Sequence, residues 1–153
     1  MSDFVMRSIG VARTPFRATA EIPKGPGAEH SAVGVLELDA DLEPGLQDVE
    51  GFSHLMVLWV FHRSEGYELL GVPPLDDRPH GVFATRSPRR PNPIGLTVVE
   101  LERRQGLRLH VRGVDMLDGT PLLDIKPYLS SIPVERIRRG WLDAADARRT
   151  AKP

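Results

Sequence analysis

A hairpin pattern in the second half of the chain most strongly constrains the fold. The runs LTVVELERR (96–104) and LRLHVRGV (107–114) are joined across Gln105-Gly106. In the second run, apolar and polar side chains alternate along the chain. The apolar set is Leu107, Leu109 and Val111, and the polar set is Arg108, His110 and Arg112. This alternation is typical of an antiparallel strand with one buried face, so it predicts a β architecture.

Further strand-like runs lie on both sides of the hairpin. They are residues 8–13, 33–38, 54–62, 81–85 and 122–129. The run 54–62, HLMVLWVFH, is almost entirely apolar, which predicts a strand buried on both faces. The stretches 15–32 and 63–80 are rich in Pro and Gly and are expected to be loops.

Helical signals are confined to two segments. Residues 133–149 have helical spacing, and Pro133 suits a helix start; a shorter helix capped by Asp41 is expected over 41–49. The apolar side of the helix expected over 133–149 is formed by Val134, Ile137, Trp141 and Ala145. The fold class is therefore mainly β, a small closed or nearly closed β-barrel with one or two short helices, because closure removes exposed strand edges. The barrel domain is expected over 1–132, with a C-terminal helix and tail over 133–153.

Composition narrows the classes of site. The 153 residues include no cysteine, which excludes disulfides and thiolate metal ligation. The five histidines form no HExxH or other compact ligand pair, so no metal site is predicted. No phosphate-binding glycine motif and no Gly-x-Ser-x-Gly elbow occurs. No apolar run approaches a membrane span and the N-terminus lacks a signal pattern, so a cytoplasmic protein is expected, although the lack of cysteine fits a secreted protein equally.

Charge is unevenly distributed. The net charge of −1 argues against bulk nucleic-acid binding. Residues 37–50 carry only negative charge, whereas 86–112 carry seven arginines against Glu100 and Glu102. This predicts a local basic surface, with solvated strand faces as an equal alternative.

The stretch TRSPRRPNPIG (85–95) is the first candidate for a binding loop. Its three prolines restrict their own backbone and that of the preceding residues, so the loop loses little entropy on binding. Arg86 offers a planar cation for a carboxylate or phosphate, and Asn92 offers a neutral donor and acceptor. The alternative is a rigid connector with incidental arginines.

The second candidate is DMLDGTPLLDIKPYL (115–129). Asp115, Asp118 and Asp124 lie close in sequence, and Asp124, Lys126 and Tyr128 would share one face of a strand. An acid, a base and a phenol on one side suit a site, although a surface strand end would explain them equally well.

The chain resembles the TsaA-like family. GVFATRSPRRPNPIGLTVVEL and DGTPLLDIKPYL are similar to its signature segments, and IGVARTPF, GFSHLMVLWVFH and the order of the pieces also match, from about Ile9 to Tyr128. The resemblance implies a small β-barrel that binds S-adenosylmethionine, usually as a homodimer with the cofactor near the subunit interface. It also implies a tRNA methyltransferase that acts on N6 of a threonylcarbamoyl-modified adenosine next to the anticodon.

Carried over residue by residue, the resemblance implies a set of cofactor-binding positions. They are Pro23, Lys24, Gly25, His62, Arg63, Arg86, Leu96, Asp118, Gly119, Thr120 and Pro121. The first loop departs from the family pattern, because PKGPG stands where the family often has Pro-Arg-Gln-Pro-Gly. Longer members of the family also carry a further C-terminal domain.

Three residues are candidates for the chemistry. An acceptor for the adenine N–H would make the exocyclic amine more reactive, and Asp124 or the amide oxygen of Asn92 suits this role. The ring of Tyr128 would pack on the base. Two other functions stay open. One is a barrel that binds S-adenosylmethionine and methylates a small metabolite or another macromolecule; the other is a sensor of S-adenosylmethionine without catalysis. A dimer that gathers Arg89, Arg90, Arg103, Arg104 and Arg108 into one groove would favour RNA.

Overall fold

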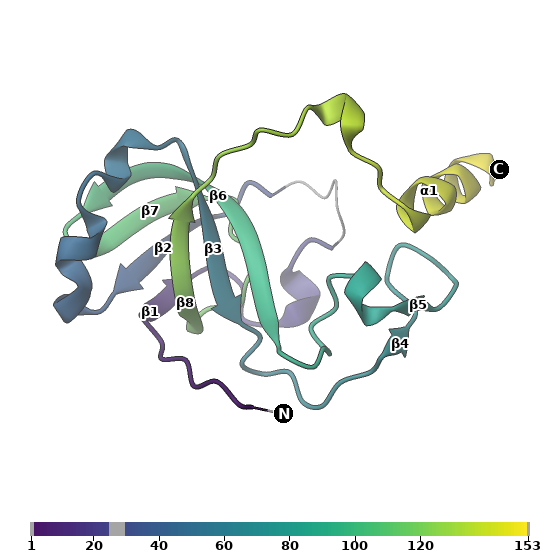
Figure 1. Cartoon of the computed structure of the whole chain (residues 1–153), viewed down its shortest axis with the longest axis horizontal. Coiled ribbons are helices and arrows are strands. Elements are labelled where there is room, and N and C mark those ends of the chain that lie inside the picture. Colours follow the sequence, from purple (N-terminus) through teal and green to yellow (C-terminus); the bar gives the residue numbers. More distant parts are fainter. Residues whose placement is uncertain (1, 25–29, 153) are drawn as a thin grey trace.

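A computed structural model describes residues 2–24 and 30–152, and its main body is a closed six-stranded barrel (Figure 1). Neighbouring strands are antiparallel in the order β1-β2-β7-β6-β3-β8, and β8 pairs back to β1. The strands are β1 Gly10–Arg13, β2 Val33–Leu38, β3 His54–Val60, β6 Ile94–Gln105, β7 Arg108–Arg112 and β8 Thr120–Pro127. Closure pairs every barrel strand on both sides, which confirms the predicted mainly β barrel.

A smaller lobe lies beside the barrel (Figure 1). In it β4 (Leu70–Gly71) pairs with β5 (His80–Gly81), and α1 (Trp141–Ala151) lies next to them. Short 3₁₀ helices span Thr19–Glu21, Ala40–Leu46, Val49–Gly51, Val82–Ala84 and Val134–Arg136. No helix in the described part of the chain has the length and apolar character that crossing a membrane requires.

Side chains on the inner faces of the strands fill the barrel. On β7, Leu109 and Val111 are buried while the flanking arginines are exposed, as the alternation predicted. On β3, Leu55, Val57 and Trp59 are buried, but the intervening residues are partly exposed. The prediction of a strand buried on both faces was therefore wrong, because the outer side of a barrel wall faces away from the core.

Three local predictions also need correction. Residues 81–85 do not form a strand, because only Gly81 pairs and a 3₁₀ turn follows at Val82–Ala84. The helix expected over 133–149 begins only at Trp141, since Gly140 adopts a left-handed φ of 55°. The helix expected over 41–49 is replaced by two 3₁₀ segments, because Pro44 donates no backbone hydrogen bond and Asp48 has a φ of 70°.

Gly95 is required by the packing of the barrel interior. A Cβ at this position would lie 2.4 Å from ring carbons of the buried Trp59. We expect Gly95→Ala to lower the free energy of unfolding by about 1–3 kcal/mol through overpacking, measured by urea denaturation. Gly45→Ala is the matched control, because a Cβ there meets nothing within 4 Å. Equal stability of the two variants would contradict this packing.

Candidate functional site

The antiparallel order gathers three long connections at one end of the barrel. β1 and β3 end here at Arg13 and Val60, and β6 and β8 begin here at Ile94 and Thr120. Segments 14–32, 61–93 and 113–119 connect the strands at this end, which we call the loop end. The stretch 85–93 and the turn 115–119 therefore lie on the same side of the barrel.

Asp115 is the half-buried carboxylate at the loop end. It follows the buried Val114 and precedes the buried Met116. Thr97 Oγ1 donates a 2.5 Å hydrogen bond to Asp115 Oδ1, and Trp59 Nε1 donates to the same Thr97 oxygen at 3.0 Å. Strands β3 and β6 thus hold one oxygen of Asp115, and no side-chain hydrogen bond from the described residues reaches its other oxygen.

The electrostatic environment of Asp115 is unusual for this chain. Burial raises the pKa of its carboxyl group, and the hydrogen bond from Thr97 lowers it in part. Positive charge on His30 and Arg86 also lowers this pKa, so both side chains lie within electrostatic reach. A carboxylate that is both desolvated and near a cation is typical of a functional site.

Arg86 lies in the segment 85–93, which we call the Arg86 loop. Its side chain is exposed, and no carboxylate of residues 2–24 or 30–152 lies within ion-pair distance of it. Arg89 pairs with Glu68 at 2.9 Å, whereas Arg90 Nη1 donates to the carbonyl oxygens of Thr85 and Ser87. The neighbouring arginines therefore hold the loop, whereas the Arg86 guanidinium has no carboxylate partner among the described residues.

The side chain of Asp118, the first residue of the Asp118–Pro121 turn, is already engaged. Asp118 Oδ1 accepts from the Thr14 amide at 3.1 Å, and Oδ2 lies 3.5 Å from Arg17. The buried Thr120 donates its hydroxyl to the Leu117 carbonyl at 2.6 Å. Gly119 has a φ of 79°, and a Cβ at this position would meet nothing within 4 Å, so a ligand could contact the turn here. The backbone amides of Asp118, Gly119 and Thr120 are already bonded to the carbonyls of Phe16, Ala12 and Leu117.

The other predicted cofactor positions are spread around the loop end. His62 and Arg63 lie just after β3, separated from it by Phe61, and Arg63 donates to the Arg17 carbonyl at 3.2 Å. Leu96 lies on the outer wall of β6 and is 54% exposed. Pro23 and Lys24 are exposed. Gly25 lies outside the described residues.

Within one chain, the structure does not bring the three predicted catalytic residues together. Asn92 lies at the loop end, just before β6. The Tyr128 amide donates to the His54 carbonyl at the opposite end of β3, about 20 Å away along seven residues of strand. Asp124 faces the outer wall, where it is 47% exposed and forms a 2.9 Å ion pair with Lys126. The shared face of Asp124 and Lys126 is confirmed.

Carboxylates largely neutralise the basic surface expected over 86–112. The ion pairs are Arg89–Glu68, Arg104–Glu43, Arg104–Glu50, Arg108–Glu37 and Arg112–Glu102. Arg104 and Arg108 also lie on the β6–β7 hairpin at the opposite end from Arg89. These arginines therefore lie at opposite ends of the barrel within one chain, and a groove gathered from the two chains of a dimer stays a prediction.

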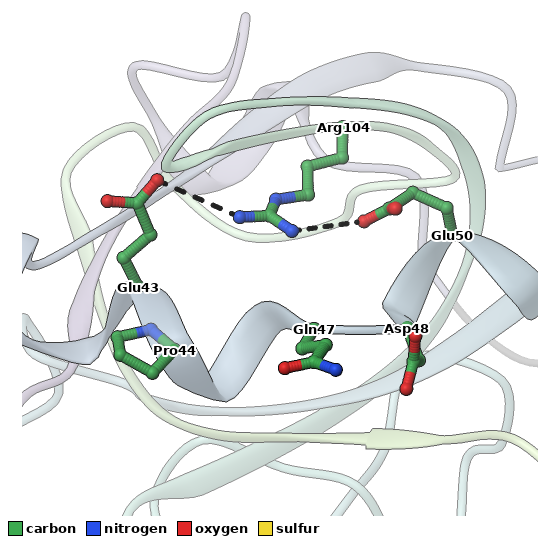
Figure 2. Close-up of a pocket in the computed structure, with 6 residues that line it drawn as sticks. All are labelled: Glu43, Pro44, Gln47, Asp48, Glu50 and Arg104. Atoms are coloured by element: carbon green, nitrogen blue, oxygen red, sulfur yellow. Dashed lines mark hydrogen bonds and ion pairs between the residues drawn. The ribbon is translucent and has the colours of Figure 1, made fainter.

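A surface hollow occurs at that opposite end (Figure 2). It is lined by Glu43, Pro44, Gln47, Asp48, Glu50 and Arg104. Arg104 lies across it, 3.8 Å from Glu43 and 3.3 Å from Glu50, as the dashed lines in Figure 2 show. No predicted site residue lines this hollow, so the candidate site stays at the loop end. Among residues 2–24 and 30–152, no three His, Asp or Glu side chains are grouped to hold a metal ion.

Comparisons with known proteins identify the family of this chain. Residues 11–133 match the family model described as the tRNA-methyltransferase O N-terminal domain. A probable S-adenosyl-L-methionine-binding protein of Pyrococcus abyssi is 46% identical over 138 residues, which are 90% of this chain and 75% of that protein. The tRNA (adenine(37)-N6)-methyltransferase of Escherichia coli is 41% identical over 139 residues, which are 84% of this chain and 59% of that enzyme.

A solved structure shares the fold. The crystal structure of TrmO from Pseudomonas aeruginosa superposes with a TM-score of 0.74 at 37% identity, over 91% of this chain and 62% of that one. This chain therefore spans about three fifths of the lengths of the Escherichia coli enzyme and of this crystallised protein.

Proposed function

Because this chain belongs to the family of tRNA-methyltransferase O N-terminal domains, we propose that it is an S-adenosylmethionine-dependent methyltransferase that acts on N6 of an adenosine in tRNA. More specifically, we propose that the substrate is a threonylcarbamoyl-modified adenosine next to the anticodon. We also propose that the protein acts in the cytoplasm as a homodimer. The main structural support is that the loop end carries both the exposed Arg86, which has no carboxylate partner among the described residues, and the half-buried Asp115, whose carboxyl group Thr97 holds.

The residues at the loop end fit the chemical groups of S-adenosylmethionine. Arg86 would pair with the methionine carboxylate, since a guanidinium matches that group with two parallel hydrogen bonds. The turn Asp118–Pro121 would frame the adenine by van der Waals contact, because its backbone amides and the Asp118 and Thr120 side chains are already engaged. When bound, this cofactor supplies a methyl group already activated by the sulfonium, so the protein mainly aligns the reactants.

Asp115 is the side chain best placed to act on the acceptor amine. Its oxygen not held by Thr97 would accept a hydrogen bond from the exocyclic N–H, which makes the nitrogen a better nucleophile. As the new N–C bond forms and the C–S bond breaks, the amine loses a proton, and Asp115 would accept it. Asn92 lies at the same end and stays a proposed acceptor. The structure favours Asp115 over Asp124, whose carboxylate is ion-paired on the outer wall.

A transfer assay tests this proposal. We expect the purified protein with S-adenosylmethionine to methylate N6 of an adenosine next to the anticodon, detected by mass spectrometry of digested tRNA. Transfer RNA lacking the threonylcarbamoyl group is the control for the finer proposal, because loss of product with it would establish that group as part of the substrate. Binding of S-adenosylmethionine without transfer to either tRNA would contradict the tRNA assignment.

The ion-paired arginines support a second candidate, a methyltransferase for an acceptor other than tRNA. Phosphate contacts supply much of the affinity for RNA, and Arg89, Arg104, Arg108 and Arg112 all have carboxylate partners. To test this function, the rate of S-adenosylmethionine consumption is measured with tRNA and with an extract of small metabolites. For this second candidate, the extract should raise the rate and tRNA should not.

The outer wall of β6 supports the proposed homodimer. Ile94, Leu96 and Val98 alternate on this wall and are 36%, 54% and 38% exposed. Three adjacent apolar side chains facing solvent are typical of an interface. We expect Leu96→Asp to convert a dimer to a monomer, measured by sedimentation equilibrium, whereas Glu100→Asp on the same strand leaves the mass unchanged. A wild-type monomer would contradict the dimer.

A further inference from the structure

The C-terminal helix α1 is anchored to the smaller lobe by a buried carboxylate. Asp76 is 3% exposed at its side chain and accepts hydrogen bonds on both oxygens. His80 Nε2 lies 2.6 Å from Oδ2, and Arg148 Nη2, from α1, lies 2.5 Å from Oδ1. Because a buried carboxylate without its partners is costly, Asp76 strongly favours the docked position of α1.

The ionisation of Asp76 keeps this contact in place across a wide pH range. The hydrogen bond from His80 lowers the pKa of Asp76 well below its ordinary value, against the effect of burial, and Arg148 lowers it further. A lowered folded-state pKa means that the stabilisation is present above the ordinary pKa and is lost only as the pH falls through the lowered one. The contribution of Asp76 to holding α1 is therefore present at neutral pH.

Trp141, the first residue of α1, makes the second contact. Its indole stacks on the His80 imidazole with ring centroids 4.3 Å apart and an angle of 15°. The indole Nε1 donates to the Ala84 carbonyl at 2.7 Å, and Arg149 Nη1 donates to the Leu75 carbonyl at 2.6 Å. The helix thus holds the backbone on both sides of β5.

The Ala84 contact lies at the start of the Arg86 loop. Ala84 is two residues before Arg86, and the Thr85 amide donates to the Val82 carbonyl at 3.1 Å. Beyond Arg86, Ser64 Oγ donates to the Pro88 carbonyl at 3.0 Å. Trp141 of α1 therefore holds the backbone before Arg86, and Ser64, which follows β3, holds the backbone after it.

We propose that Trp141 and Arg148 are positioning residues through which α1 holds the Arg86 loop in its binding geometry. The helix lies beyond residues 11–133, which match the family model, so this role goes beyond the proposed function. It rests on that function only for the identity of the ligand, S-adenosylmethionine. The separation of 133–153 as a helix and tail stays a prediction, but these contacts tie α1 to the segment that presents Arg86.

Two measurements on four variants of the full chain test this role. Trp141→Phe keeps the stacking ring but removes the donor to Ala84; Arg148→Ala removes a partner of Asp76, and Arg148→Lys keeps a charged donor. The control is Arg139→Ala, because the ion pairs of Arg139 within residues 2–24 and 30–152 are with Asp143 and Asp146 of α1 and not with the smaller lobe. Hydrogen exchange of residues 82–90 and the dissociation constant for S-adenosylmethionine by calorimetry are measured for each.

We expect Trp141→Phe to weaken S-adenosylmethionine binding about threefold to tenfold and to speed exchange of residues 82–90. Arg148→Ala should weaken binding and speed exchange more strongly than Trp141→Phe does. Arg148→Lys should restore part of the affinity and of the protection from exchange. The main melting transition of each variant should stay that of the wild type. If Trp141→Phe and Arg148→Ala both keep the wild-type exchange rates and the wild-type affinity for S-adenosylmethionine, the inference is overturned. The proposed function would then still stand. If the wild type binds no S-adenosylmethionine but the variants exchange faster, positioning by α1 is supported and only the ligand assignment fails.

Discussion

Asp115→Asn is expected to lower the turnover of methyl transfer by about 100-fold or more while raising the melting temperature. Asparagine keeps the shape of the side chain and an oxygen that accepts from Thr97, but it cannot take up a proton. Turnover falls because the amine loses its proton acceptor. Stability rises because a neutral amide replaces a carboxylate whose ionised form is disfavoured by burial.

The pH dependence of stability separates this explanation from a general packing effect. The folded-state pKa of Asp115 lies above its ordinary value, so the folded state favours the protonated form. The relative stability of the wild type is therefore greatest below the ordinary pKa and declines as the pH rises through the folded-state pKa. The difference in melting temperature between Asp115→Asn and the wild type should grow over this window and vanish at lower pH, as calorimetric scans would show.

Asp124→Asn is the matched control, because its carboxylate is ion-paired with Lys126 and half exposed on the outer wall. It should leave the melting temperature nearly unchanged, since exposed ion pairs contribute little stability. If Asp124→Asn loses turnover and Asp115→Asn keeps it, the acceptor role belongs to Asp124, as the sequence alone suggested. If Asp115→Asn is more stable and less active than the wild type, Asp115 serves function and lowers the stability of the fold.

Strand alternation made most of the barrel predictable. The β6–β7 hairpin follows from local sequence, because a two-residue period and the Gln105-Gly106 turn leave few alternatives. The errors arose where backbone conformation or long-range contacts decide the structure. The left-handed backbone of Gly140 prevents residues 133–139 from forming one continuous helix with α1. The β4–β5 pair consists of strands of two residues each, which are too short to carry a sequence pattern.

The candidate site was predictable only in part, for a related reason. The Arg86 loop and the Asp118–Pro121 turn stand out by composition and by resemblance to a family. Asp115 was noted only as one of three nearby acids and was given no role, because its neighbours Val114 and Met116 are core residues and its environment comes from other strands. The only local signal was an acidic residue within an apolar run. The sequence also could not show that Asn92 and Tyr128 lie at opposite ends of one barrel, since strand direction around the closed sheet decides that.

Arg86→Ala is expected to weaken S-adenosylmethionine binding about 10- to 150-fold, the loss of one charge-assisted pair worth roughly 1.5–3 kcal/mol. The fold should be unaffected, because Arg86 is exposed and has no carboxylate partner among the described residues. Isothermal calorimetry measures the affinity, and Arg86→Lys should retain part of it, since an ammonium keeps the charge but not the two-pronged geometry.

Arg103→Ala provides the control for a loss of positive charge alone. Arg103 is also exposed, but it lies near the β6–β7 turn at the opposite end of the barrel. Equal weakening in both variants would mean that S-adenosylmethionine responds to the overall charge of the chain and not to the loop end. Weakening confined to Arg86→Ala would place the methionine carboxylate beside the Arg86 loop. Asp115 lies at the same loop end, so the acceptor amine would then be sought beside it.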